Sequence, residues 1–145
     1  CVKPNLNDVG IIGQRIPEVN SELCKGCKKC AIEAACPNGV AKVVDGKITI
    51  DEMQCRHCGR CVGKCPFHTI ADGIYGYKIY IGGRWGKKIS RGKSLSKIFA
   101  SKEDALNVIE KAISFFRDNG LKAERFAETI ERIGFENVEK ALLQD

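Results

Sequence analysis

The sequence has few aromatic residues and no long apolar run. Aromatic residues make up 7% of the 145 residues, so little large side-chain surface is available for a core. No stretch approaches the roughly 18 consecutive apolar residues of a membrane-spanning helix, and we predict no membrane span. The start lacks the charged segment and apolar centre of a secretory signal. Hydrophobic residues still make up 43% of the chain, enough for one domain or two small ones.

Cysteine, in contrast, is abundant, with nine residues. Without a secretory signal, this number indicates a reducing, cytoplasmic setting and metal ligation. Thiols spaced this closely cannot form mutually unstrained disulfides, because a disulfide restricts the separation of its two Cα atoms. Metal sites supply folding energy, so a small domain built on them needs little core.

Eight of the nine cysteines fall in two similar runs. The run from Cys55 has the spacing C-x2-C-x2-C-x3-C-P, and the run from Cys24 has C-x2-C-x2-C-x5-C-P. This spacing is typical of bacterial-type ferredoxins with two 4Fe–4S clusters, in which the cysteine before proline ligates the cluster of the other run. We therefore assign one cluster to Cys24, Cys27, Cys30 and Cys65. The other cluster is assigned to Cys36, Cys55, Cys58 and Cys61.

The alternative for these cysteines is a pair of structural zinc sites, each with four thiolates. Zinc ribbons usually pair two C-x2-C units, whereas each run here has three cysteines followed by C-P, which favours clusters. Each oxidised cluster with its thiolates carries about −2. Two clusters would thus offset most of the formal net charge of +6, and the basic excess does not require nucleic acid.

Residues 17–73 are predicted to form a two-cluster ferredoxin-like domain with an internal duplication. We expect short helices over residues 29–35 and 60–64. The two extra residues before Cys36 should lengthen the first of them. A hairpin is predicted over residues 39–51, because Asp-Gly at positions 45 and 46 is a strong turn signal between two β-forming stretches.

The flanking segments predict further strands and helices, so the fold class is α+β. Short strands are expected at Val9–Ile12, closed by Gly13, and over residues 73–83. From Ser101, which resembles a helix cap, the chain reads as helical, with stops at Asn119-Gly120 and Gly134. The first of these helices is expected to bury one face, formed by Ala105, Leu106, Ile109, Ala112, Ile113 and Phe116.

Residues 84–97 contain six basic residues and no acidic one. Glycines in this segment let the backbone approach a ligand, and arginine can hold an oxyanion with two parallel hydrogen bonds. A solvated basic surface is one alternative. A nucleic-acid patch is another, but such patches interleave aromatic residues and only Trp85 lies here. We favour binding of a cofactor or a small anion and expect no nucleic-acid partner.

The segments around the cysteine runs resemble the siroheme-dependent sulfite and nitrite reductases, most closely the anaerobic and dissimilatory type. The matching stretches are Cys1–Lys3, Asp8–Gly13, Ile79–Lys88 with Arg91-Gly92, and Ile133–Glu136. In that family a ferredoxin domain is inserted into a siroheme-binding half. The resemblance implies that residues 1–16 and 74–145 form part of such a half, and that the chain is a C-terminal fragment of a longer oxidoreductase.

The resemblance also implies roles for several residues. Cys1 would be the thiolate that bridges siroheme and its coupled 4Fe–4S cluster, whose other ligands would lie upstream. An electron donor protein or subunit would reduce the two ferredoxin-type clusters, and sulfite or nitrite would be reduced at siroheme. The fragment alone is expected to be inactive. Siroheme carboxylates or the substrate anion would be bound by Lys3, Arg84, Lys87, Lys88 and Arg91.

Two other functions remain open at this point. The chain could be a stand-alone two-cluster ferredoxin-type electron carrier or subunit with a helical partner-binding tail. It could also be a zinc-stabilised binding module, which would be colourless and would contain two zinc ions. Iron content separates the second from the other two, and the coding sequence before Cys1 separates the carrier from the reductase.

Overall fold

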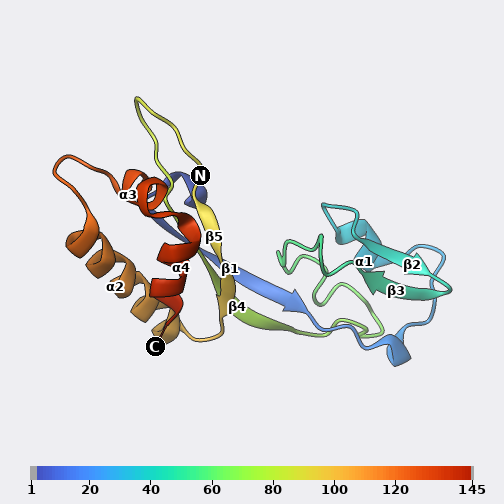
Figure 1. The fold of residues 1–145 in the computed structure, drawn as a ribbon. Helices are drawn as coiled ribbons and strands as arrows, with labels where there is room; N and C mark the ends of the chain where they lie inside the picture. The colour runs from blue at the N-terminus through green and yellow to red at the C-terminus, as the bar shows by residue number, and fades with distance from the viewer. Residues whose placement is uncertain (1–2, 145) are drawn as a thin grey trace. The chain divides into compact units, whose positions relative to one another are not determined.

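The computed structural model describes residues 3–144, and the chain divides into two compact units. The cysteine unit is Gln14–Tyr75, and the helical unit combines the segment that ends at Gly13 with the one that begins at Gly76. Strands β1 (Val9–Pro17) and β4 (Gly73–Ile81) each cross a boundary between the units. Helices and strands occur together (Figure 1), and the predicted α+β class is confirmed.

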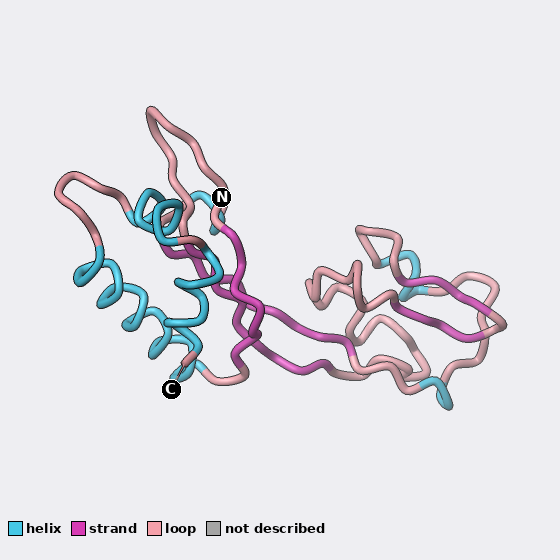
Figure 2. The backbone as a smooth tube through the Cα atoms, viewed as in Figure 1, coloured by secondary structure: helices cyan, strands magenta, loops and turns pink. Residues whose placement is uncertain are grey.

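The cysteine unit consists mainly of loops around one short hairpin, as Figure 2 shows. The 3-10 helix η2 (Ser21–Leu23) and the helix α1 (Ala31–Ala35) precede the antiparallel strands β2 (Ala41–Val44) and β3 (Lys47–Ile50). The two turn residues between these strands have φ of 49° and 73°, as a type I′ turn requires. The predicted hairpin and its Asp-Gly turn are therefore confirmed, and the first predicted helix is present as the shorter α1.

The predicted helix over residues 60–64 is wrong, because these residues form tight turns. The N–H of Val62 donates to the carbonyl oxygen of Gly59 (3.1 Å), and the N–H of Lys64 donates to that of Cys61 (3.3 Å). Gly59 and Gly63 have φ of 71° and 69°. A left-handed residue ends a helix, so Gly59 directly before this segment and Gly63 within it leave no room for a full helical turn.

The helical unit joins a three-stranded sheet of order β1-β4-β5 to three helices. Strand β5 (Lys93–Phe99) pairs antiparallel with β4, and the 3-10 helix η1 (Pro4–Leu6) precedes β1. Helices α2 (Lys102–Asn119), α3 (Phe126–Ile133) and α4 (Phe135–Leu143) lie together beside the strands in Figure 1. Their shared core is formed by Ile79, Ile81, Leu95, Phe99, Ala105, Val108, Ala112, Phe126, Ile130, Val138 and Leu142.

Two strands differ from the sequence prediction. β1 does not stop at Gly13 but continues to Pro17, and β5 begins inside the basic segment 84–97, for which the sequence predicts no strand. Both strands flank β4 in the sheet. Their extent depends on backbone hydrogen bonds to that neighbour rather than on local pattern, and these bonds outweigh the weakening that glycine causes within a strand.

The predicted helix ends are confirmed. The N–H of Asp104 donates to Ser101 Oγ at 3.0 Å at the start of α2. Gly134, with φ of 93°, separates α3 from α4. Gly120 follows the last residue of α2 but has φ of −70°, so the helix ends there without a left-handed cap.

The buried face of α2 is narrower than predicted. Ala105, Val108 and Ala112 are its buried residues. Leu106 and Ile113 are 46% and 61% exposed, so their placement on the buried face is wrong. Side chains of β5, α3 and α4 contact α2 along the stripe formed by these three residues, so the rest of its apolar surface stays exposed or only partly buried. Within residues 3–144, α2 and the other helices are too short or too polar to cross a membrane.

Candidate functional site

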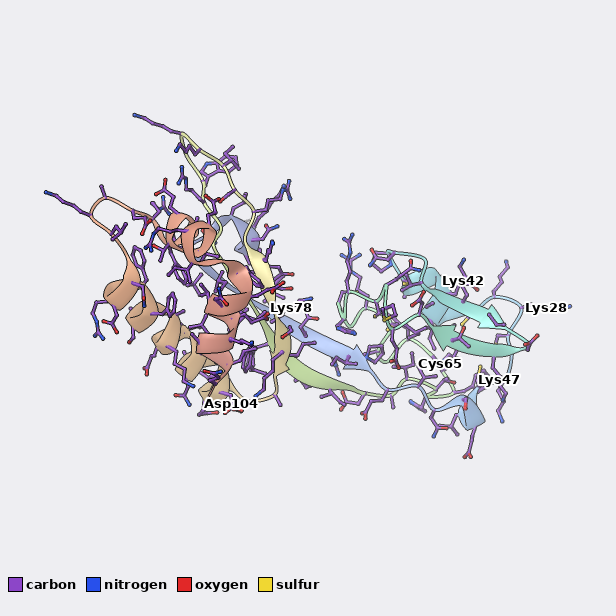
Figure 3. All side chains as sticks on the ribbon, in the orientation of Figure 1. Lys28, Lys42, Lys47, Cys65, Lys78 and Asp104 are labelled. Carbon is purple, nitrogen blue, oxygen red and sulfur yellow. The ribbon has the colours of Figure 1, made fainter. Side chains whose placement is uncertain are left out.

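The first cysteine run, residues 24–30, is held by the strand β3. The Nζ of Lys47 donates hydrogen bonds to the carbonyl oxygens of Ser21 (3.0 Å) and Cys24 (2.9 Å). The backbone N–H of Ile48 donates to Cys24 Sγ at 3.4 Å. Lys47 is labelled in Figure 3. The hairpin therefore positions this loop and already provides one hydrogen bond to a sulfur.

The second run, residues 55–61, is a loop with two left-handed residues. The N–H of Cys55 donates to the carbonyl oxygen of Asp51 at 2.9 Å, and the N–H of His57 donates to Cys55 Sγ at 3.4 Å. His57 and Gly59 have φ of 49° and 71°. These turns provide the same kind of N–H to sulfur contact as in the first run.

Cys36 lies beside the second run, although it belongs to the first. Cys36, Cys55, Cys58 and Cys61 line one cavity. The structure thus brings together the four side chains that the sequence assigns to one cluster. The other residues that line this cavity are Pro17, Pro37, Asn38, Val40, Ala41, Ile50, Arg56, Gly59 and Arg60.

The thiols of this cavity differ in their electrostatic surroundings. Burial raises the pKa of Cys36, but backbone N–H groups of residues 38–41 outweigh it and lower the pKa below its ordinary value. Burial raises the pKa of Cys61, and the neighbouring thiolates of Cys55, Cys58 and Cys36 raise it further. Thiolates this close repel one another, so the arrangement suits a cationic group among them.

The set Cys24, Cys27, Cys30 and Cys65 lies beside a small buried core that Cys36 also contacts. Three of its members pack against this core, and Cys27 is exposed. Cys65 Sγ lies 3.4 Å from Oγ1 of the buried Thr69. Burial raises the pKa of Cys65, but hydrogen bonds from Thr69 and from the backbone bring the pKa below its ordinary value. The core residues are Ile32, Ala41, Ile48, Cys61 and Ile70.

All eight cysteines of the two sets are free thiols. Among residues 3–144, no three Cys, His, Asp or Glu side chains are grouped around the position of a single metal ion. Soft thiolates with N–H donors to sulfur are the ligands that iron–sulfur clusters use. The ninth cysteine, Cys1, lies outside the described residues, so the structure does not bear on its predicted bridging role.

Arg84 in the basic segment is already paired. Its Nη1 lies 2.8 Å from Glu128 Oε1, and its side chain is only 12% exposed. Its Nε donates to the carbonyl oxygen of Lys88 at 3.2 Å, and the Lys88 Nζ lies 3.9 Å from the same Glu128 oxygen. The pKa of Glu128 is lowered, first by the backbone N–H of Arg125 and then by Arg84. Sequence reasoning missed Glu128, because nothing local marks it as the partner of a distant loop.

The other predicted anion-binding residues are exposed. Lys3, Lys87 and Arg91 all present their side chains to solvent. Arg91 also lines an open cavity with Ser90 and Lys93. The basic segment therefore has one arginine, Arg84, whose contacts stabilise the loop, and several exposed cationic side chains that are accessible to an anion.

Comparison with known proteins agrees with this description. The nitrite and sulphite reductase 4Fe-4S domain family matches residues 1–145. The coenzyme F420-dependent sulfite reductase of Methanocaldococcus jannaschii is 30% identical over 141 residues, covering 93% of this chain and 22% of that protein. The dissimilatory-type sulfite reductase subunit alpha of Megalodesulfovibrio gigas is 25% identical over 135 residues, covering 87% of this chain and 68% of that protein.

Among solved structures, the crystal structure of dissimilatory sulfite reductase I matches with a TM-score of 0.63 and 23% identity. The match covers 98% of this chain and 39% of that one, and at this identity it shows the fold alone. The family match, in contrast, covers every residue of the chain. The resemblance predicted from the sequence is confirmed, and the chain belongs to the nitrite and sulphite reductase 4Fe-4S domain family.

Proposed function

We propose that this chain holds two 4Fe–4S clusters and is the electron-relay part of a siroheme sulfite reductase. The Cys36 site is formed by Cys36, Cys55, Cys58 and Cys61. The Cys65 site is formed by Cys24, Cys27, Cys30 and Cys65. The observation that carries the proposal is that Cys36 lines one cavity with the cysteines of the other run, because crossed ligation is the mark of two-cluster ferredoxins.

The residues around each site fit such a cofactor. When bound, each cluster takes up and releases one electron at a time. The N–H groups of Ile48 and His57 donate to ligand sulfurs and would withdraw negative charge from them, which raises a reduction potential. Both runs turn sharply at left-handed residues, at Gly26 in the first and at His57 and Gly59 in the second.

The flanking segments would form part of the siroheme-binding half. Both relatives described above are named as sulfite reductases, so we favour sulfite over nitrite as the anion. Lys3, Lys87, Lys88 and Arg91 would bind siroheme carboxylates or the anion, and Arg84 would hold the loop through Glu128. Cys1 would bridge siroheme and its coupled cluster, and an electron donor protein would reduce the Cys36 and Cys65 sites.

Metal analysis and EPR test the two clusters. The anaerobically purified chain should contain about eight iron and eight sulfide ions, four of each per cluster. Cys58→Ala should lose half of them, and Met53→Ala, an exposed neighbour outside both sites, should lose none. Two zinc ions without iron would contradict the proposal.

Double variants test the crossing. Cys36→Ala combined with Cys58→Ala should lose no more iron than Cys58→Ala alone, since both residues belong to the Cys36 site. Cys36→Ala combined with Cys27→Ala should lose both clusters. If the two results are exchanged, each run ligates its own cluster and the proposed sets are wrong.

The coding sequence before Cys1 tests the siroheme half. In the sulfite and nitrite reductases that the chain resembles, a C-x5-C pair and a later C-x3-C pair hold the siroheme-coupled cluster. The proposal therefore expects a cysteine four residues upstream of Cys1 and an earlier C-x5-C pair. A start codon directly upstream would instead make the chain a stand-alone two-cluster electron carrier. In that case the iron results above would still hold, and only the basic segment would need another ligand.

A further inference from the structure

Arg15, near the end of β1, lies directly on the second cysteine run. Its N–H donates to the carbonyl oxygen of His57 at 2.8 Å, and it forms a parallel bridge with Cys58. A Cβ built on Gly59 would lie 2.8 Å from Arg15 Cβ and 3.1 Å from Arg15 Cδ. The arginine stem therefore covers the loop beside Cys58, and only glycine at position 59 leaves room for it.

The guanidinium of Arg15 is held by an ion pair and by contact with an aromatic ring. Nη2 lies 2.7 Å from Asp72 Oδ1, and Cζ lies 4.9 Å from the centroid of the Tyr75 ring. The hydrogen bond to Asp72 is the main cause that raises the pKa of Arg15 above its ordinary value. Arg15 thus presents a permanent positive charge in a fixed position.

The Nε of Arg15, where the guanidinium joins the side-chain stem, is buried and has no hydrogen-bond acceptor among the described residues. The side chain as a whole is nevertheless 35% exposed. A buried cationic N–H without an acceptor is costly. Its stem packs on the loop of Cys55, Cys58 and Cys61, so a negatively charged group on that loop would offset this cost.

We propose that Arg15, in addition to Arg56 and Arg60 that line the cavity, compensates part of the negative charge of the cluster at the Cys36 site and raises its reduction potential. This inference rests on the proposed function. On reduction, one electron from the donor takes the cluster and its thiolates from about −2 to about −3. A fixed cation beside them stabilises the reduced form more than the oxidised form. Arg15 itself is neither a ligand nor an electron carrier.

A redox titration of the chain with both clusters tests this role, with dithionite as reductant and EPR as the readout. Arg15→Gln should lower the ratio of reduced to oxidised cluster at the wild-type midpoint by about tenfold, which is about 59 mV for a one-electron couple. Only the Cys36 site should respond. Its signal is identified as the one that Cys58→Ala removes.

Three further variants separate charge from structure. Arg15→Lys keeps the charge and should shift the potential much less than Arg15→Gln. Asp72→Asn removes the opposing carboxylate and should raise the potential of the same site. Lys42→Gln makes the same change in net charge at an exposed position on β2, labelled in Figure 3, and should leave both potentials nearly unchanged.

The outcomes distinguish this inference from the proposed function. A fully loaded Arg15→Gln protein with unchanged potentials refutes the role of Arg15 and leaves the two clusters intact. Fewer than about eight irons in the unaltered chain refutes the proposed function instead. If Arg15→Gln loses a cluster, the potential of Asp72→Asn is the test. A higher potential at the Cys36 site in that variant supports the inference, and an unchanged potential overturns it.

Discussion

The cysteine unit and the helical unit bury their interiors with different side chains. The core of the cysteine unit has only four aliphatic residues, Ile32, Ala41, Ile48 and Ile70, together with the thiol of Cys61. The core of the helical unit combines aliphatic and aromatic residues of two strands and three helices. Full burial of one large apolar side chain stabilises a fold by about 1.5–3 kcal/mol, whereas each ordered residue costs about 1–2 kcal/mol of backbone entropy.

This difference indicates that the two units are stabilised by different forces. In the cysteine unit, few apolar side chains are available to order long loops, so binding of the proposed clusters would supply much of the folding energy. In the helical unit, side-chain packing can do so without a cofactor. Perturbing one unit at a time tests this difference between them.

Removal of iron should have the largest effect. With a chelator under reducing conditions, the backbone amides of Gln14–Tyr75 should lose protection from hydrogen exchange, because their loops lose the cluster bonds. The amides of α2, α3 and α4 should keep theirs. Mass spectrometry of the whole chain measures both, and equal loss of protection in the two units would show that they do not differ in this way.

Ile79→Ala should destabilise the helical unit and leave the cysteine unit unchanged. Ile79 in β4 is fully buried in the helical core, and such a truncation costs about 2–5 kcal/mol. Thermal unfolding of the helical unit should move to lower temperature while the iron content stays unchanged. Ile113→Ala, in an exposed position of the same unit, is the control and should change stability by no more than about 0.5 kcal/mol.

Two glycines of the cysteine unit form a matched pair for a smaller effect. Gly26 and Gly39 both have φ of 64°, but a Cβ on Gly26 would lie 2.6 Å from the carbonyl oxygen of Gly46, whereas Gly39 has open space around it. Alanine at either position carries the left-handed strain of about 1–2 kcal/mol. Only Gly26→Ala adds a backbone clash.

The rate at which iron is lost to a chelator measures this pair. Gly26→Ala should release iron faster than Gly39→Ala, and the excess should come from the Cys65 site, whose first run contains Gly26. Equal rates in the two variants would mean that the hairpin turn does not hold that loop in position.

The smallest effect on stability is expected from the carboxylate of Glu124 in the helical unit. A hydrogen bond from Arg132 is the main cause that lowers the pKa of Glu124 to about 2, with further help from the N–H of Leu121 and the hydroxyl of Thr129. In the unfolded chain the pKa is near 4.5. The ionised carboxylate therefore stabilises the fold above about pH 4.5, and this contribution is lost as the pH falls towards 2.

Glu124→Gln should accordingly lower the free energy of unfolding at neutral pH. The difference in unfolding free energy between this variant and the unaltered chain should become smaller as the pH falls from about 4.5 towards 2. Urea unfolding of the iron-free chain at several pH values measures this difference. A gap that stays constant with pH would show that the charge of Glu124 is not responsible.

Local features of this chain could be predicted from its sequence. The hairpin turn at Asp45 and Gly46, the cap at Ser101 and the helix stop at Gly134 are all present as predicted. Each depends on the conformational preference of one or two residues and on hydrogen bonds to near neighbours. The cysteine spacing likewise indicated iron–sulfur ligation, because the geometry of a cluster limits which spacings a loop can use.

Features that depend on partners far along the chain required the structure. β5 exists because it pairs with β4, and Leu106 and Ile113 are exposed because other helices cover a different stripe of α2. Arg84 meets Glu128, and Arg15 meets Asp72 and the loop of Cys58, across long sequence separations. The residues that carry the chemistry and the positions where the chain turns follow from short-range preferences that can be recognised in the sequence. Which charges and apolar surfaces meet depends on the folded chain, because those contacts form between segments whose separation in the sequence does not reveal their pairing.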